Sequence, residues 1–145
     1  MGHAERIREV VSREAVRLRS IPAAKTATPP APGKWCAREV LGHLVDSVNN
    51  NIQRVVRAQQ VDRLEFPAYA QNDWVRVQGY AEVDWGQLVD LWVALNRHFA
   101  HVVERIPARK GSTICVIGGG TPMTLDAMVA DYLRHLEHHL EQIQA

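Results

Sequence analysis

The chain has 145 residues, of which 46% are hydrophobic and 23% are charged, and its formal net charge at pH 7 is +1. This length suits one domain with a core of its own, so we expect a single domain over residues 1–145. Its near-neutral charge gives no basic surface for nucleic acid or anionic membrane, and no apolar run approaches the roughly 18 residues of a membrane span.

The amino end and the cysteines indicate the compartment. The sequence begins with charged and amphipathic residues, unlike a secretory signal. Cys36 and Cys115 lie far apart and form no CxxC pair. We therefore expect free thiols in a cytoplasmic protein.

The first half of the chain predicts two helices. Residues 4–20 have a helical apolar period and end before Pro22, and residues 23–34 carry three prolines and a glycine typical of a loop. A second helix is predicted from about 36 to 60. Its apolar stripe comprises Val40, Leu41, Leu44, Val45, Val48, Ile52, Val55 and Val56.

The second half predicts two more helices after a long connection. Residues 62–83 are weakly patterned and aromatic, and indicate a loop with a short helical piece at 73–78. Asp84 opens a third helix with a capping box, and the helix ends before Pro107. Residues 113–117 form a plausible strand, and Thr124 is a good N-cap for a fourth helix through 142.

Four amphipathic segments predict an all-α four-helix bundle. The inward faces should include Ile7, Val10, Val11, Glu14 and Leu18 in the first helix, and Leu88, Leu91, Trp92, Leu95, Phe99, Val102 and Ile106 in the third. The connection between the second and third helices exceeds twenty residues. A connection of that length is usually functional or partly structured.

The fourth helix carries the strongest chemical signal, because three of the seven histidines fall within five positions. His135 and His139 are four residues apart, so they lie on one helix face and could hold one metal ion between two imidazoles. His138 falls on the opposite, polar side. Alternatively, the two histidines bind no metal and are only favoured there by the negative end of the helix dipole. This segment alone is equally compatible with both interpretations.

His43 is the best third ligand candidate. It lies outside the apolar stripe of its helix, in a row with Ser47, Asn50 and Arg54. That row is either a solvated face or the wall of a polar cavity, and periodicity alone favours the solvated face. Asp46 and Glu39 lie within a turn and could orient the imidazole, although exposure is the usual state of a carboxylate.

Two other sets of residues could contribute to a site. His98 and His101 are spaced i, i+3, but they diverge around the third helix, so a shared metal ion is less favoured. Trp74, in the long connection, is the tryptophan that could contact a ligand.

Several segments together resemble the DinB/YfiT-like superfamily. They are Gly33-Lys-Trp35 through Glu39-Val-Leu-Gly-His43-Leu-Val-Asp46-Ser47, then Asn72-Asp73-Trp74-Val75 to Gln78-Gly-Tyr80, and finally Thr124 to Ile143 with its histidine cluster. The resemblance covers residues 30 to 143. It implies an up-down-down-up four-helix bundle, often dimeric, with zinc or nickel on His43, His135 and His139.

The resemblance also implies a set of activities. Those known in the superfamily include S-transfer from low-molecular-weight thiols, thiol-dependent isomerisation and hydrolysis. A site of three histidines leaves coordination positions open, as catalytic sites do. We therefore predict a metal-dependent thiol S-transferase acting on a small molecule, with Asn50, Arg54 and Trp74 binding the thiol or substrate.

Two alternatives stay open. One is a metal-dependent hydrolase, in which the ion would activate water. The other is a non-catalytic metal- or ligand-binding bundle, or a homodimeric interaction module.

Overall fold

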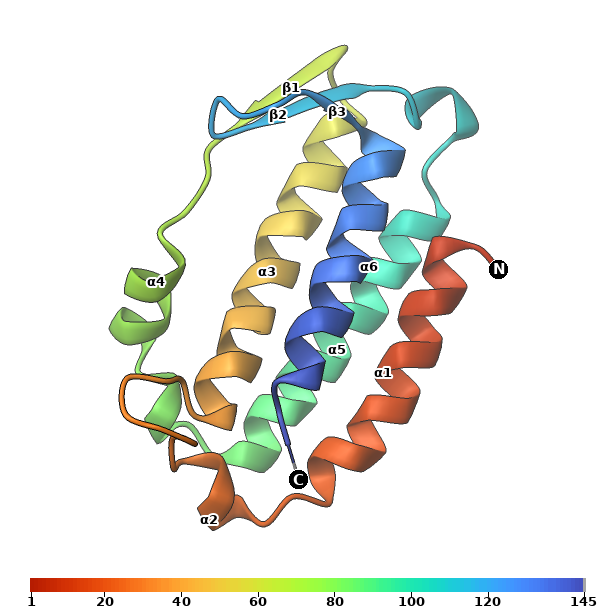
Figure 1. The fold of residues 1–145 in the computed structure, drawn as a ribbon. Helices are drawn as coiled ribbons and strands as arrows, with labels where there is room; N and C mark the ends of the chain where they lie inside the picture. The colour runs from red at the N-terminus through yellow and green to blue at the C-terminus, as the bar shows by residue number, and fades with distance from the viewer. Residues whose placement is uncertain (145) are drawn as a thin grey trace.

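Four long helices form the body of the protein in a computed structural model that describes residues 1–144 (Figure 1). They are α1 (His3–Arg19), α3 (Ala37–Ala58), α5 (Trp85–Glu104) and α6 (Leu125–Glu141). Helices α1 and α3 each pack against both α5 and α6. In Figure 1, α3 and α5 run in one direction and α1 and α6 in the other. The predicted four-helix bundle with up-down-down-up topology is therefore confirmed.

The inward face of α1 matches the prediction residue by residue. Ile7, Val10, Val11, Glu14 and Leu18 are all buried. Glu14 tolerates burial because Arg17 Nε lies 2.6 Å from its Oε2, and a paired charge costs far less to bury than a lone one. Arg17 also donates to the backbone carbonyl oxygens of Leu140 and Ile143, at 2.9 and 2.5 Å, which satisfies carbonyls at the end of α6.

The predicted inward faces of the middle helices are partly wrong. Leu91 on α5 is 45% exposed and Val56 on α3 is 40% exposed. On α5 the buried face is rotated toward Val89, Val93 and Asn96. Asn96 is tolerated there because its side-chain amide donates to the Trp92 carbonyl at 2.9 Å and its carbonyl accepts from the Tyr132 hydroxyl.

A small three-stranded sheet covers one end of the bundle, so the strictly all-α prediction is wrong (Figure 1). The strands are β1 (Arg63–Phe66), β2 (Ile114–Ile117) and β3 (Met123–Thr124). Strand β1 runs parallel to β2, and β3 runs antiparallel to it. Only β2, with its apolar residues Ile114 to Ile117, was predicted. Strand β1 has charged residues at two of its four positions, and β3 has only two residues, too few for a readable alternation.

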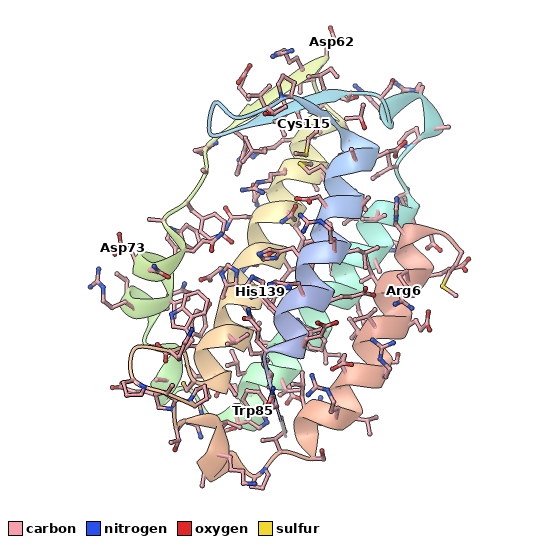
Figure 2. The ribbon with its side chains drawn as sticks, in the orientation of Figure 1. Arg6, Asp62, Asp73, Trp85, Cys115 and His139 are labelled. Carbon is pink, nitrogen blue, oxygen red and sulfur yellow. The ribbon has the colours of Figure 1, made fainter. Side chains whose placement is uncertain are left out.

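Cys115 and Trp85 lie near opposite ends of the core. Figure 2 shows Cys115 beneath the sheet and Trp85 near the opposite end of the bundle. Cys36 and Cys115 are both free, as the spacing of the cysteines predicted, and both are buried. Every helix formed by residues 1–144 is too short or too polar to reach across a bilayer.

The connection between α3 and α5 is partly structured and lies along the bundle. Its helical part consists of α4 (Gln71–Gln78) and the 3₁₀ turn η1 (Tyr80–Glu82), and both pack on α3. Gly79 separates them with a φ of 61°, a left-handed conformation that glycine adopts without strain. The earlier loop over 23–34 contains one short helix, α2 (Ala23–Thr26).

Thr124 and Asp84 cap the helices that follow them. The Thr124 hydroxyl accepts from the Ala127 amide at 3.1 Å, and the Asp84 carboxylate accepts from the Gln87 amide at 3.0 Å. Replacing Thr124 by alanine should reduce the free energy of unfolding by about 1 kcal/mol, because one amide at the start of α6 loses its acceptor. Urea denaturation measures this change. Thr121→Ala, at an exposed position outside the helix, is the control and should change stability little.

Candidate metal centre

Three histidines from two helices converge within the bundle. His43 lies on α3 and His135 and His139 on α6, and one ring nitrogen of each lies within 4.8 Å of the others. The Nε2 atoms of His43 and His135 are 3.3 Å apart. Figure 2 shows His139 at the seam between α3 and α6. The i, i+4 spacing on α6 thus places two imidazoles on consecutive turns that face the third.

His43 is fully buried, so the solvated face that periodicity favoured is wrong. The apolar period of α3 marks only part of its buried surface, because α4 and η1 also pack on this helix and residues 40–48 are buried without interruption. The His43 ring itself packs against Trp35 and against His135 and His139 of α6, with ring centroids 5.2, 5.1 and 4.7 Å away. Residues distant in the sequence therefore bury His43.

Burial keeps the histidines in the state that binds metal. It lowers the pKa of His43 to about 4, with a further contribution from the nearby His139 and His135. Burial likewise lowers the pKa of His135 to about 4, and His139 is again the next cause. Both rings are therefore neutral at pH 7. A neutral imidazole offers the lone pair that a metal ion needs.

Neither neighbouring carboxylate orients His43. Asp46 is buried rather than exposed, and it accepts hydrogen bonds from the Tyr80 hydroxyl at 2.7 Å and from Gln78 Nε2 at 2.8 Å. Burial raises the pKa of Asp46. Glu39 instead accepts from the Cys36 backbone amide at 3.1 Å, at the start of α3. The second ring nitrogen of His43, Nδ1, is buried without a hydrogen-bond partner.

This donor set fits a divalent transition metal. Nitrogen ligands of this kind suit zinc and nickel, and three protein ligands leave room for water or substrate. Within residues 1–144 the histidine cluster includes no carboxylate or thiol. The Nε2 of His43 is the atom that faces His135, which leaves its Nδ1 to carry the proton in a bound state.

Two cavities reach the histidine cluster, one at His135 and the other at His139. The first, here called the Arg54 cavity, has a volume of about 260 Å³ and includes His135 in its wall. Its other lining residues are Ser47, Asn51, Arg54, Ala68, Tyr69, Gln71, Ile117, Met123, Met128, Asp131 and Tyr132. The second, here called the Trp35 cavity, has a volume of about 440 Å³ and includes His139. It is also lined by Pro30, Gly33, Lys34, Trp35, Val40, Asn72 and Gln142.

Of the predicted ligand-binding residues Asn50, Arg54 and Trp74, one lines a cavity beside the histidines. Arg54 lines the first one, whereas Asn50 does not, and its side-chain amide donates to the Asp46 carbonyl at 2.9 Å. Trp74 is 40% exposed on α4 and packs against Tyr69 with the rings tilted by 52° and their centroids 4.9 Å apart. Trp74 therefore contacts a wall residue of the Arg54 cavity from outside.

Sequence reasoning missed two residues of the site. Ser47, which it placed in one row with His43, lines the Arg54 cavity, and so does Asn51, which it did not single out although helical spacing could have indicated it. Trp35 packs on His43, with ring centroids 5.2 Å apart, and no periodicity places this loop residue there. His98, His101 and His138 are exposed, and none belongs to the cluster.

The stability of the metal-free protein should fall as pH decreases from about 6.5 toward about 4. The unfolded chain takes up protons near the ordinary histidine pKa of 6.5, whereas His43 and His135 resist protonation until about 4. Protons therefore favour the unfolded state in this range, and His43 alone should contribute on the order of 2 kcal/mol.

Urea denaturation at a series of pH values measures this dependence. A metal-free His43→Gln protein should show a shallower dependence, because one resistant group is removed. His98→Gln, at an exposed position, should keep the full dependence. A wild-type stability that does not change across the range would contradict the prediction.

The sequence and the fold were compared with known proteins. A family described as the DinB superfamily matches residues 6–143. A protein of Halalkalibacterium halodurans, named as a candidate metal-dependent hydrolase, is 24% identical over 110 residues, and the match covers 76% of this chain and 64% of that protein. The chain thus spans less than two thirds of this relative.

Two solved structures share the fold. YfiT from Bacillus subtilis, described as a candidate metal-dependent hydrolase with an unusual four-helix-bundle topology, superposes with a TM-score of 0.85 at 19% identity. That match covers 97% of this chain and 81% of YfiT. A mycothiol-dependent maleylpyruvate isomerase superposes with a TM-score of 0.79 at 12% identity, over 100% of this chain and 62% of the isomerase.

Proposed function

The chain belongs to the DinB superfamily, and on that basis we propose that it is a metal-dependent enzyme that transfers a low-molecular-weight thiol to a small electrophile. The observation that carries the proposal is a cluster of three histidines that reaches two cavities, one lined by His135 and the other by His139. Hydrolysis needs one organic substrate and water, whereas S-transfer needs two organic substrates. Two cavities beside one histidine cluster offer room for both of them.

The three imidazoles would hold a zinc or nickel ion through the nitrogens that face one another. A bound divalent ion would lower the pKa of a thiol at the site, so that the sulfur is a nucleophile at neutral pH. The thiol sulfur forms a bond to the electrophilic carbon, the leaving group departs with the electrons of its own bond, and the thiol proton passes to solvent. Trp35, which covers the His43 ring, would keep water from this side of the site.

A fluorescence assay with added thiols tests the reaction. The purified chain, loaded with zinc or nickel, is mixed with a fluorogenic haloalkyl electrophile and with bacillithiol, mycothiol or glutathione in turn. We expect one of the thiols to give a rate that saturates with thiol concentration. His98→Ala, at an exposed position away from the cluster, should keep that rate.

The alternative functions give different results in the same experiment. A hydrolase is the second candidate, because one relative and one solved structure carry that name. Cleavage of an ester without any thiol, together with no thiol-dependent rate, would favour it. We rank it lower because no carboxylate in residues 1–144 joins the histidine cluster as a general base. Bound metal without turnover of either substrate would favour a non-catalytic binding bundle.

A further inference from the structure

We propose that the Arg54 cavity binds a carboxylate group, which Arg54 holds beside the histidine cluster. The inference rests on the proposed function, since it names the chemical class of one of the two substrates. Arg54 and His135 line the same cavity, so a molecule bound to the arginine lies next to a candidate metal ligand.

Among residues 1–144, no carboxylate pairs with the charge of Arg54. Its Nε is buried and has no hydrogen-bond partner within these residues. Burial lowers its pKa, and the only opposing influence comes from Tyr69 rather than from a carboxylate. Its guanidinium carbon lies 5.7 Å from the centre of the Phe66 ring, so one contact of this cation is with an aromatic side chain.

The other partly buried arginines of residues 1–144 all have partners. Arg6 pairs with Glu137 at 2.7 Å, Arg8 with Glu104 at 3.0 Å, Arg17 with Glu14 at 2.6 Å, and Arg38 donates to the Val83 carbonyl at 3.0 Å. Folding normally leaves a buried cation paired, because an unpaired one loses its hydration without compensation. An unpaired arginine in a cavity wall is therefore suited to an anion that comes from outside the chain.

The cavity selects a carboxylate rather than a phosphate. Arg54 is its only lysine or arginine, whereas Asp131 also lines it and would repel a doubly charged group. The Asp131 carboxylate is itself paired with Arg134, so it does not neutralise Arg54. One planar guanidinium matches one carboxylate through two parallel hydrogen bonds. Apolar side chains of Ile117, Met123 and Met128 provide the wall for an uncharged body.

Calorimetric titration of the metal-free protein tests the subsite independently of metal chemistry. The probes are 3-phenylpropionate and its neutral amide, which share the same body. We expect the acid to bind at least about tenfold more tightly than the amide, since a charge-assisted hydrogen bond is worth that much. Arg54→Gln should abolish the preference, and Arg54→Lys should restore part of it.

Arg57→Gln is the matched control. Arg57 lies on the same helix, and its guanidinium carbon is 6.0 Å from the same Phe66 ring, but it is exposed and donates to Gln53. This variant should keep the preference for the acid. Circular dichroism establishes that each variant is folded.

Three results would overturn the proposal. They are equal binding of acid and amide, a preference for the acid that survives Arg54→Gln, and tighter Arg54-dependent binding of phenyl phosphate. Because the titration uses metal-free protein, each result is separate from a failure of S-transfer, which only the metal-loaded assay can show.

Two further probes identify the substrate that carries the carboxylate. Zinc-loaded protein is titrated with 3-mercaptopropionate and with 2-mercaptoethanol. An Arg54-dependent preference for the acidic thiol supports a carboxylate on the thiol substrate. Equal binding of the two thiols, with the preference for 3-phenylpropionate retained, supports a carboxylate on the electrophile.

Discussion

Replacing His43 by alanine should reduce the metal content of the purified protein from near one ion per chain to almost none. His43 is the one ligand candidate that α3 supplies, and its Nε2 lies 3.3 Å from that of His135. Loss of a residue that only supports a ligand already costs roughly 10–100-fold in metal affinity, so loss of the ligand itself should cost more than about 100-fold. Elemental analysis and a zinc titration measure the change.

The control for this variant is His98→Ala. His98 forms a second histidine pair with His101, with ring centroids 6.4 Å apart, but both residues are exposed on α5. Its loss should leave the metal content unchanged. Since His43 is buried, His43→Gln provides a polar replacement of closer size should the alanine variant unfold. Stoichiometric metal in a folded His43 variant would remove this residue from the site.

Replacing Gly42 by alanine should reduce the free energy of unfolding by about 3 kcal/mol or more, through overpacking of a site that cannot relax cheaply. A Cβ atom at Gly42 would lie 2.2 Å from Cγ and Cδ2 of the Tyr80 ring. Tyr80 is 5% exposed, and its hydroxyl donates to Asp46, so the ring cannot move without breaking this buried hydrogen bond. Displacement of Tyr80 would also disturb the packing of η1 on α3.

Gly86→Ala is the matched control for this substitution. Gly86 also lies in a long helix, but the nearest atom to its added Cβ, in Asp84, would be 3.4 Å away. Alanine has the higher helix propensity, so this variant should be neutral or more stable by up to about 1 kcal/mol. Urea denaturation of both variants measures the difference. Equal stabilities would contradict the close packing of α3 against Tyr80.

Much of this structure follows from local patterns in the sequence. The four long helices, the buried face of α1 and the caps at Asp84 and Thr124 rest on helical periodicity and on capping residues. The spacing of His135 and His139 likewise determines that they share a helix face. These features depend on residues within one or two helical turns, so a single sequence contains the information.

The features that the sequence did not predict depend on contacts between distant segments. His43 is buried because Trp35 and the His135 and His139 rings of α6 pack against it, and no pattern within α3 states this. Asp46 is buried because Tyr80 and Gln78, more than thirty positions away, donate to it. The sheet joins β1 to β2 across a separation of 51 residues, from Arg63 to Ile114, and no local pattern pairs the two strands.

The sheet has a consequence for how this domain can diversify. The Arg54 cavity draws one wall from α3 and α6 and another from Ala68, Tyr69, Ile117 and Met123, which lie in or beside the strands. Insertions or replacements in these connections would reshape that wall of the cavity without moving the helices that carry the histidines. The shape of this wall can therefore diverge while the metal ligands and Arg54 are preserved.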